Sequence, residues 1–400
     1  MVARDVVIVG SGPAGSSTAL HLLKQDAALA GEILILEKAR HPREKICAGG
    51  LIPHTLHCLG ELDIPLTVPY VRVDRARVCV PPGRTVHCAD AGMCSVVRRD
   101  AFDYSLIQAA RARGVEVREG EKVLELVREA GWVRVVTEKD TYRARVVVGA
   151  DGSGSRVRRQ LVGDDPSAIA KALMCDIPLK ETDWSGFQER RYDFNFLPVA
   201  RGLKGYLWTF PCLVDGVPHV NVGVYSLGDT PLTQGGLRHL LLQELVSLTA
   251  PVSERLSLPR LRAFPIYGYR PRRPLAAPHV VLVGDAAGVE PLMGEGISFA
   301  LEYGKFAAQA IGCALRTGQF EFRDYTEAVA GSWLGKKLAR LCFTARLFYG
   351  ATSRFWFALA ARSRRLQSIG LKWYNGVDGW HQRSGWEALR TLLSSSSFRA

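Results

Sequence analysis

The sequence predicts an α/β protein, α+β overall. A domain built on a parallel sheet is interrupted by an inserted mixed β-sheet and followed by a helical C-terminal region. The chain opens on a strand, a glycine turn and a helix, and a buried strand with a glycine turn returns near residue 280. Between residues 165 and 273, short β-type runs alternate with Gly and Pro turns. This order indicates one discontinuous α/β domain that carries an inserted β domain.

The composition is that of a soluble enzyme with a large core. The chain has 400 residues, which is longer than a single hydrophobic core usually serves. Of these residues, 47% are hydrophobic and 23% are charged. Its nine cysteines form no C-x-x-C pair, so neither a disulfide framework nor a zinc site is indicated. The N-terminus runs straight into a strand and no apolar run approaches about 18 residues, so we expect neither a signal peptide nor a spanning helix. The cytoplasm is the expected location.

The first element, residues 5–38, carries a G-x-G-x-x-G motif between a strand and a helix. Gly10 permits the tight turn, Gly12 lets a pyrophosphate approach the backbone, and Gly15 allows the helix to pack on the strand. The next strand, residues 32–38, contains Glu37, where a carboxylate can bind ribose hydroxyls. This context predicts a Rossmann-like dinucleotide site, with the positive helix end facing the phosphates.

The remaining elements set the expected domain boundaries. A helical pattern covers residues 99–114, and strands follow at 115–120, 122–129, 132–138 and 145–152. β-type runs cover 205–212 and 219–227, and helices are expected over 237–248 and 296–315. We therefore assign residues 1–60, 95–165 and 275–330 to the Rossmann-like domain. The β-sheet domain takes 61–94 and 166–274, and a basic helical region takes 331–400.

Residues 280–304 form a second chemistry-bearing stretch. Asp285 follows a buried strand, where its carboxylate can bind a sugar-like hydroxyl. Gly294 and Gly296 leave room for a flat ring, and the helix that begins near Gly296 would point its positive end at that ring. Two smaller stretches, "RRDAFD" with Arg99 and "GADGSGSRVRR" with Asp151, accompany it. Each of these two, taken alone, could also be a solvated turn.

These four stretches, in this order, resemble the para-hydroxybenzoate-hydroxylase type of FAD-dependent oxidoreductase. The resemblance covers about residues 1–330 and implies FAD, with its adenosine end at the glycine motif and its ribityl and phosphate region at Asp285. No second G-x-G-x-x-G occurs, so a dedicated domain for a nicotinamide cofactor is not indicated. The resemblance implies that the electron donor, NADPH or ferredoxin, visits only transiently. The resemblance implies that FAD contacts Gly10, Gly12, Pro13, Ala14, Gly15, Glu37, Lys38, Lys45, Ala48, Gly49, Arg99, Asp151, Gly284, Asp285, Pro291, Gly294, Gly296 and Ile297.

Two further stretches resemble the geranylgeranyl reductase family within that superfamily. They are "HPREKICAGGL", which departs from the family pattern at Ala48, and "GYLWTFP" followed by "NVGVY". The resemblance implies saturation of carbon–carbon double bonds in a polyprenyl lipid or diphosphate. Cys47, Tyr206 and Trp208 would be catalytic, with Phe210 and Gly294 beside the substrate. From residue type alone, a cysteine in an apolar loop is usually inert, and an aromatic strand is usually core.

Other functions stay open at this point. A hydroxylase or halogenase acting on an aromatic substrate would use the same fold, and a non-catalytic flavin-binding or nucleic-acid-binding protein is a third possibility. Between residues 331 and 400, twelve Lys and Arg face only two acidic residues. These basic residues alternate with bulky apolar ones, a pattern that favours an anionic membrane surface over nucleic acid. We therefore expect peripheral contact with the inner face of the membrane, an electron-transfer partner and no nucleic acid.

Overall fold

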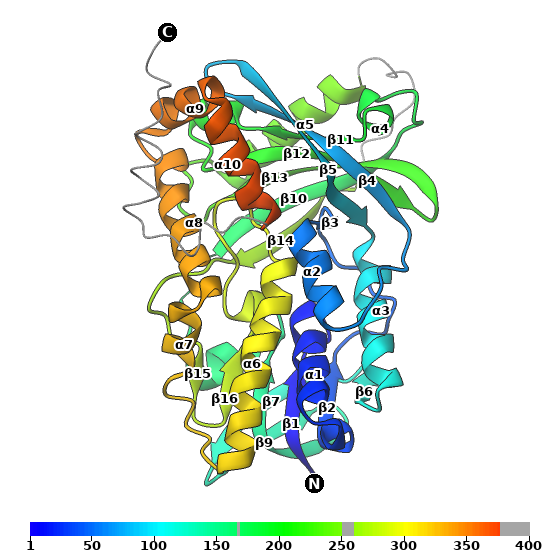
Figure 1. Cartoon of the computed structure of the whole chain (residues 1–400), viewed down its shortest axis with the longest axis vertical. Helices are drawn as coiled ribbons and strands as arrows, with labels where there is room; N and C mark the ends of the chain where they lie inside the picture. Colours follow the sequence, from blue (N-terminus) through cyan, green and yellow to red (C-terminus); the bar gives the residue numbers. More distant parts are fainter. Residues whose placement is uncertain (166–168, 250–259, 377–400) are drawn as a thin grey trace.

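The computed structural model describes residues 1–165, 169–249 and 260–376, which form two sheets with helices packed around them (Figure 1). Residues 377–400 of the predicted basic region lie outside the described part of the chain. The described helices are α1 (Pro13–Gln25), α2 (Pro53–Glu61), α3 (Arg99–Ala112), α4 (Ser185–Gln188), α5 (Gln234–Thr249), α6 (Ile297–Thr317), α7 (Tyr325–Gly331), α8 (Trp333–Tyr349), α9 (Ser353–Arg362) and α10 (Arg364–Asn375).

The first sheet is parallel at its centre. Its order is β15 (Ala276–Ala277), β16 (Val280–Leu282), β9 (Thr141–Gly149), β1 (Val2–Val9), β2 (Ile33–Glu37) and β6 (Glu116–Glu119). A meander of β7 (Val123–Glu129) and β8 (Trp132–Thr137) extends from β9. The central strands are buried on both faces, so they read as unbroken apolar runs such as residues 6–9 and 33–36. This sheet is the predicted Rossmann-like domain.

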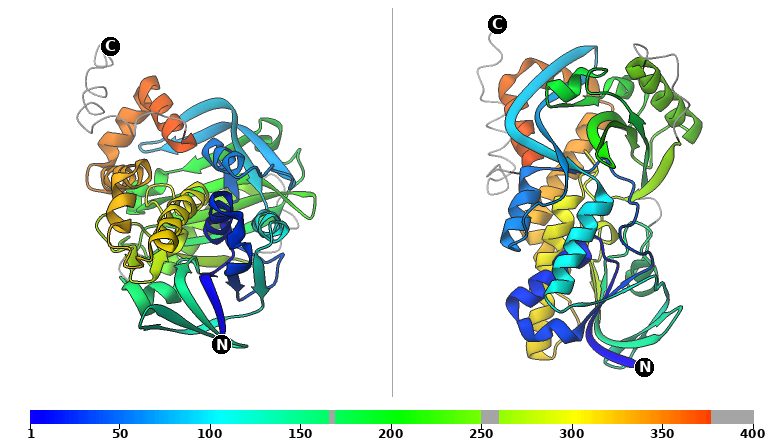
Figure 2. Two further views of the ribbon diagram at one scale, coloured as in Figure 1. Left: turned by 60° about the horizontal axis from the view of Figure 1, so that its bottom comes forward. Right: turned by 90° about the vertical axis from the view of Figure 1, so that its right-hand side faces the viewer.

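Helices α1 and α6 lie side by side against one face of this sheet (Figures 1 and 2). Ser17 on α1 donates a hydrogen bond from its hydroxyl to the carbonyl oxygen of Leu301, at 2.7 Å. A Cβ at Gly304 would lie 2.6 Å from the same hydroxyl, so only glycine allows this close approach. The contact joins the N-terminal glycine motif to the stretch that follows Asp285, although 284 residues separate them.

The second sheet is mixed and lies beyond the carboxyl ends of the first sheet's strands. Its order is β14 (Arg262–Tyr267), β10 (Ile169–Pro178), β13 (Val217–Ser226), β12 (Gly205–Val214), β11 (Arg191–Asn195), β4 (Tyr70–Val80), β5 (Arg84–Val97) and β3 (Gly50–Leu51). Strand β3 and the last residues of β5 belong to this sheet. The domain boundaries predicted from the sequence, 1–60 and 95–165, assign them instead to the Rossmann-like domain. The chain therefore passes from the first sheet to the second between Glu37 and Gly50, in the segment that contains Cys47.

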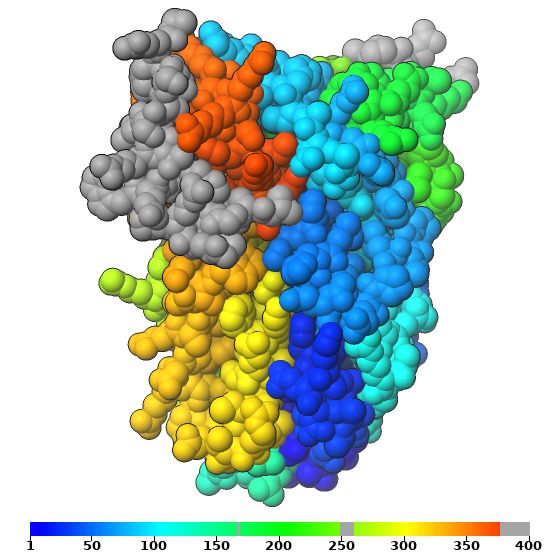
Figure 3. All heavy atoms as spheres, viewed as in Figure 1, coloured from blue at the N-terminus to red at the C-terminus, as the bar shows by residue number. Residues whose placement is uncertain are grey.

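The two faces of the second sheet have different partners. Leu207, Val222 and Val224 pack with α5 in one apolar cluster. On the opposite face, the aromatic side chains of β11 and β12 pack with Tyr349 and Phe357, which come from α8 and α9. Helices α9 and α10 also lie against the β4–β5 hairpin, as Figure 3 shows on the molecular surface. The described part of the basic C-terminal region is thus a structural cover for this sheet.

None of the described helices combines the length and the apolar character that crossing a lipid bilayer requires.

Candidate active site

A cavity of about 650 Å³ runs from the glycine motif of β1–α1 to the aromatic face of the second sheet. Residues of both sheets line it. Its two ends have different chemistry, because the first presents backbone amides and carboxylates and the second presents rings and aliphatic groups. The candidate site residues that line it are Gly10, Gly12, Pro13, Ala14, Glu37, Lys38, Lys45, Cys47, Ala48, Gly49, Arg99, Asp151, Tyr206, Trp208, Phe210, Asp285, Gly294, Gly296 and Ile297.

Three glycines shape the polar end. Gly10 has a φ of +104°, and a Cβ on it would lie 2.3 Å from the carbonyl oxygen of Ala150. A Cβ on Gly15 would lie 2.1 Å from the carbonyl oxygen of Gly10, so helix α1 could not approach β1. At Gly12 the nearest atom to such a Cβ is on Arg43, at 3.7 Å, so the backbone there faces open cavity. Together they leave the N-terminus of α1 accessible to an anionic group.

Glu37 stands at the end of β2 beside this helix N-terminus. Its carboxylate accepts hydrogen bonds from the hydroxyl of Ser11 at 2.6 Å and from the backbone N–H of Ala39 at 3.0 Å. Arg43 forms an ion pair with it at 3.3 Å. Burial raises the pKa of Glu37, but Arg43 and the hydrogen bonds outweigh that effect and lower the pKa overall. An ionised acceptor at this place suits ribose hydroxyls.

Two oppositely charged side chains stand further along the cavity. Lys45 Nζ lies 3.9 Å from the carboxylate of Asp285 and 3.4 Å from the centre of the Phe264 ring. Burial lowers the pKa of Lys45, and Asp285 offsets this only in part. Asp285 lies in a 3-10 turn, Gly284–Ala286, directly after β16. The pair is therefore held between the two sheets.

Arg99 is buried on a helix, so the solvated-turn interpretation is wrong for its stretch, whereas the second stretch is a turn after β9 in which Asp151 is half-buried. Arg99 belongs to α3 and donates two hydrogen bonds to Asp103, at 2.8 and 3.2 Å. Asp151 accepts backbone N–H bonds from Arg156 and Val157, at 2.6 and 3.2 Å, so it fixes the turn after β9. Both side chains line the cavity.

The aromatic end of the cavity is built on β12. Alternation along this strand puts Tyr206, Trp208 and Phe210 on the face toward the cavity and Leu207 on the other, as predicted. Neighbouring β13 pairs Gly223 with Trp208, and a Cβ on Gly223 would lie 2.1 Å from the indole ring. The glycine of "NVGVY" therefore makes room for the tryptophan. The Trp208 ring N–H donates to Asn221 at 2.7 Å, which fixes its orientation.

Cys47 lies near side chains of both ends of the cavity, Lys45 and Arg99 at one and Tyr206 at the other. It lines both the large cavity and a small adjoining pocket that Arg98, Arg99 and Cys212 also line. Its sulfur accepts a hydrogen bond from the backbone N–H of Gly49 at 3.4 Å and contacts the Arg99 side chain. Gly49 has a φ of +79°, and a Cβ on it would lie 2.0 Å from the carbonyl oxygen of Val97. The two glycines after the cysteine thus let the chain turn into β3.

Known proteins resemble this chain over most of its length. The FAD binding domain family matches residues 3–324. Digeranylgeranylglycerophospholipid reductase of Methanocella arvoryzae is 30% identical over 353 residues, which cover 84% of each chain. Geranylgeranyl diphosphate reductase of Rhodobacter capsulatus is 30% identical over 332 residues, covering 79% of this chain and 76% of that one.

The chain belongs to the geranylgeranyl reductase family of FAD-dependent oxidoreductases.

Solved structures show how widely this family shares its fold. A geranylgeranyl bacteriochlorophyll reductase-like protein of Thermoplasma acidophilum has a TM-score of 0.76 and 21% identity, and covers 98% of this chain and 100% of its own. The flavin-dependent brominase Bmp2 has a TM-score of 0.75 at 19% identity, with 98% of each chain covered. At these identities the likeness concerns the fold alone.

The residues of this geranylgeranyl reductase family member fit FAD. The backbone at Gly12 faces open cavity, and the N-terminus of α1 next to it has no side-chain cap. The ionised Glu37 lies beside this helix N-terminus. Gly15, Gly284 and Pro291 do not line the cavity. Gly15 and Gly284 instead allow close packing around α1, and the carbonyl of Pro291 accepts a hydrogen bond from Tyr225 at 3.2 Å.

The loop between β16 and α6 is fixed from two sides, which the sequence did not reveal. Tyrosine hydroxyls donate to three successive carbonyls: Tyr225 to Pro291, Tyr349 to Leu292 and Tyr206 to Met293. From within, the buried Glu290 carboxylate accepts the backbone N–H groups of residues 292, 293 and 295. Because Tyr349 lies on α8, the C-terminal region helps to hold this loop.

Several cavity residues escaped the sequence argument. Tyr225 could have been found, because it stands opposite Tyr206 in the "NVGVY" strand. Tyr374 on α10 had no such signal, since only the packing of α10 on the second sheet brings it to the cavity. Its ring lies 5.9 Å from that of Phe194. The cavity residues missed in this way include Met174, Phe194, Tyr225, Phe264, Met293, Glu295 and Tyr374.

Proposed function

We propose that this protein reduces isolated carbon–carbon double bonds in a polyprenyl chain. The observation that carries the proposal is one continuous cavity that joins a dinucleotide cradle to an aromatic slot, with Cys47 where they meet. Relatives at 30% identity are named for geranylgeranyl lipid and diphosphate substrates, which supports this substrate class. When bound and reduced, FAD supplies a hydride.

The residues of the slot bind the chain and exclude water. Tyr206, Trp208 and Phe210 are each at most 6% exposed, and they offer one apolar wall to a long flexible substrate. Burial raises the pKa of Tyr206 well above its usual value, and its hydroxyl proton is already bonded to the Met293 carbonyl. We therefore assign Tyr206 to the wall and not to proton transfer.

Saturation of an alkene also needs a proton at the second carbon. Cys47 carries a thiol at the junction of the two ends, in contact with Arg99 and with the Gly49 amide. We assign the proton-donating or substrate-gating role to this thiol. NADPH or ferredoxin would supply the electrons in a transient encounter, and the single G-x-G-x-x-G motif of the sequence gives no sign of a second, dedicated nicotinamide site.

The test is anaerobic turnover of geranylgeranyl lipids and geranylgeranyl diphosphate by the photoreduced protein. Each saturated bond adds a hydride and a proton, so the product mass should rise by about two units per bond. A mass gain of one oxygen atom that depends on dioxygen would instead identify a hydroxylase. A gain of one halogen atom in the presence of halide would identify a halogenase, the activity named for one structural neighbour.

Replacing Gly223 with alanine should damage the slot and spare the cofactor site. The new Cβ would lie 2.1 Å from the Trp208 ring, so the indole must move into the cavity. Overpacking of this kind costs about 1–3 kcal/mol of folding free energy. Product formation should fall about tenfold or more, while FAD content stays at the wild-type level.

Gly235→Ala is the matched control, because the nearest atom to a Cβ at this position is 3.8 Å away. Equal turnover in both variants would contradict the assigned wall.

The described C-terminal helices support the proposal of peripheral membrane contact. Phe343 on α8 is 61% exposed and Phe355 on α9 is 59% exposed, among the basic side chains of both helices. Each Lys or Arg near an anionic bilayer contributes about 1 kcal/mol, and salt screens this attraction. Residues 377–400, which carry further basic side chains, lie outside the described residues.

Co-sedimentation with anionic vesicles checks this contact. The wild type should bind, and binding should weaken at high salt. Replacing Phe343 and Phe355 with serine should reduce it several-fold, since apolar side chains insert below the headgroups. Val246→Ser on α5, where the residue is 68% exposed, is the control and should bind like the wild type. Equal binding to neutral and anionic vesicles would rule out the electrostatic contact.

A further inference from the structure

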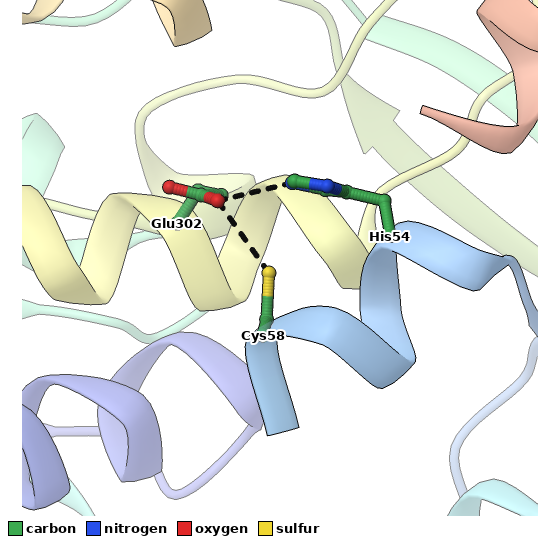
Figure 4. A group of neighbouring side chains, drawn as sticks. All are labelled: His54, Cys58 and Glu302. Carbon is green, nitrogen blue, oxygen red and sulfur yellow. Dashed lines mark hydrogen bonds and ion pairs between the residues drawn. The ribbon is translucent and has the colours of Figure 1, made fainter. Parts of the chain in front are cut away.

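His54, Cys58 and Glu302 form a buried cluster between α2 and α6 (Figure 4). His54 and Cys58 are four residues apart on α2, so they share one face of that helix. Glu302 reaches them from the second turn of α6. The three residues are 8%, 2% and 3% exposed, and none lines the cofactor cavity. We propose that these three residues bind one divalent transition-metal ion of the zinc type.

The separations of the donor atoms suit a common ion. His54 Nε2 lies 3.0 Å from Glu302 Oε1, and Cys58 Sγ lies 3.5 Å from the same oxygen. The three ligand atoms all lie within 4.8 Å of one another. Tetrahedral zinc with ordinary bond lengths would separate N from O by about 3.4 Å and S from O by about 3.6 Å. Small side-chain movements are therefore enough to place an ion among them.

The hydrogen bonding of the cluster is incomplete without an ion. Nε2 of His54 is buried and makes no hydrogen bond among the described residues, although the Glu302 carboxylate oxygen lies 3.0 Å from it. Oε2 of Glu302 is also buried without a partner there. Buried charges in proteins are normally paired or coordinate metals. A divalent ion would use the nitrogen lone pair and neutralise the carboxylate.

The donor set selects the kind of ion. A thiolate and an imidazole favour zinc and similar transition metals, whereas Mg²⁺ and Ca²⁺ prefer oxygen alone. A divalent ion with one thiolate and one carboxylate leaves no net charge in the buried site. Three protein ligands leave a fourth position for water. The site would fix α2, which follows the Cys47 loop, to α6, which begins at the cofactor cavity.

The metal content of the purified FAD-loaded full-length protein tests the proposal directly. After dialysis against zinc-containing and then metal-free buffer, about one zinc should remain per chain. X-ray absorption at the zinc edge should show one sulfur at about 2.3 Å and nitrogen or oxygen ligands at about 2.0–2.2 Å. Cobalt(II) in place of zinc should give visible d–d absorption at wavelengths longer than those of the flavin. Absence of retained zinc, or zinc without a sulfur ligand, overturns the proposal.

Variants locate the site within the chain. Cys58→Ala should lower zinc affinity about tenfold or more, because one of three protein ligands is lost. Cys313→Ala is the matched control, since this cysteine is exposed further along α6, and it should retain zinc like the wild type. Glu302→Gln keeps the side-chain volume and should also weaken binding. If Cys58→Ala and Glu302→Gln both hold zinc as tightly as the wild type, the cluster is instead a His54–Glu302 ion pair.

Discussion

Cys47→Ala should form product about a hundredfold more slowly than the wild type, as expected when a general acid is removed. The cavity geometry explains why the loss should be selective. If the protein has the proposed function, this thiol, which lines both the large cavity and the small pocket beside it, is placed where the second carbon of the alkene would receive its proton. Single-turnover product formation from photoreduced protein measures this step without requiring the physiological electron donor.

Three controls separate this role from a structural one. FAD content and thermal stability should stay near wild-type values, because Gly49 and the glycine motif are unchanged. Reduction of the flavin should also persist. Cys47→Ser restores the size of the side chain but offers a far weaker acid, so recovery in serine would identify a steric gate and continued loss would identify proton transfer. Wild-type turnover in both variants would mean that Cys47 only packs.

The cofactor end could be predicted from the sequence because its determinants are local. The turn at Gly10, the packing at Gly15 and the acceptor at Glu37 lie within 28 consecutive residues whose spacing reflects one strand–helix–strand unit. The alternation of Tyr206 and Trp208 is equally local and is confirmed. The basic charge of the C-terminal region predicts a surface role, but it does not predict which of its side chains pack inward. Packing showed that α8 and α10 also contribute Tyr349 and Tyr374 to the loop and the cavity.

Other features depend on contacts between distant segments. Glu302 and Cys58 are 244 residues apart, so no short motif such as C-x-x-C indicates that they could be metal ligands. Their meeting depends on how α2 packs against α6. The three tyrosines that hold the loop at Pro291–Met293 come from β12, β13 and α8, and each looks in the sequence like an ordinary core aromatic. Tertiary packing, and not residue pattern, gives these side chains their roles.

Gly12→Val should abolish the yellow colour of the purified protein while leaving its fold intact. The nearest atom to a Cβ on Gly12 lies 3.7 Å away, so the side chain meets no backbone and points into the cavity. It would occupy the space through which the pyrophosphate approaches the N-terminus of α1. FAD affinity should fall about a hundredfold or more, since the cradle depends on close backbone approach to the phosphates.

A matched pair of variants separates cofactor exclusion from misfolding. Gly31→Val, at a position with nothing within 4 Å, should keep full FAD content. Gly15→Val should lose both FAD and stability, because its Cβ would lie 2.1 Å from the Gly10 carbonyl oxygen and must push α1 away from β1. Far-ultraviolet circular dichroism should therefore match the wild type for Gly12→Val and not for Gly15→Val. Retention of FAD by Gly12→Val would show that the phosphates do not lie against this turn, and the assignment of the cavity's polar end to FAD would have to be abandoned.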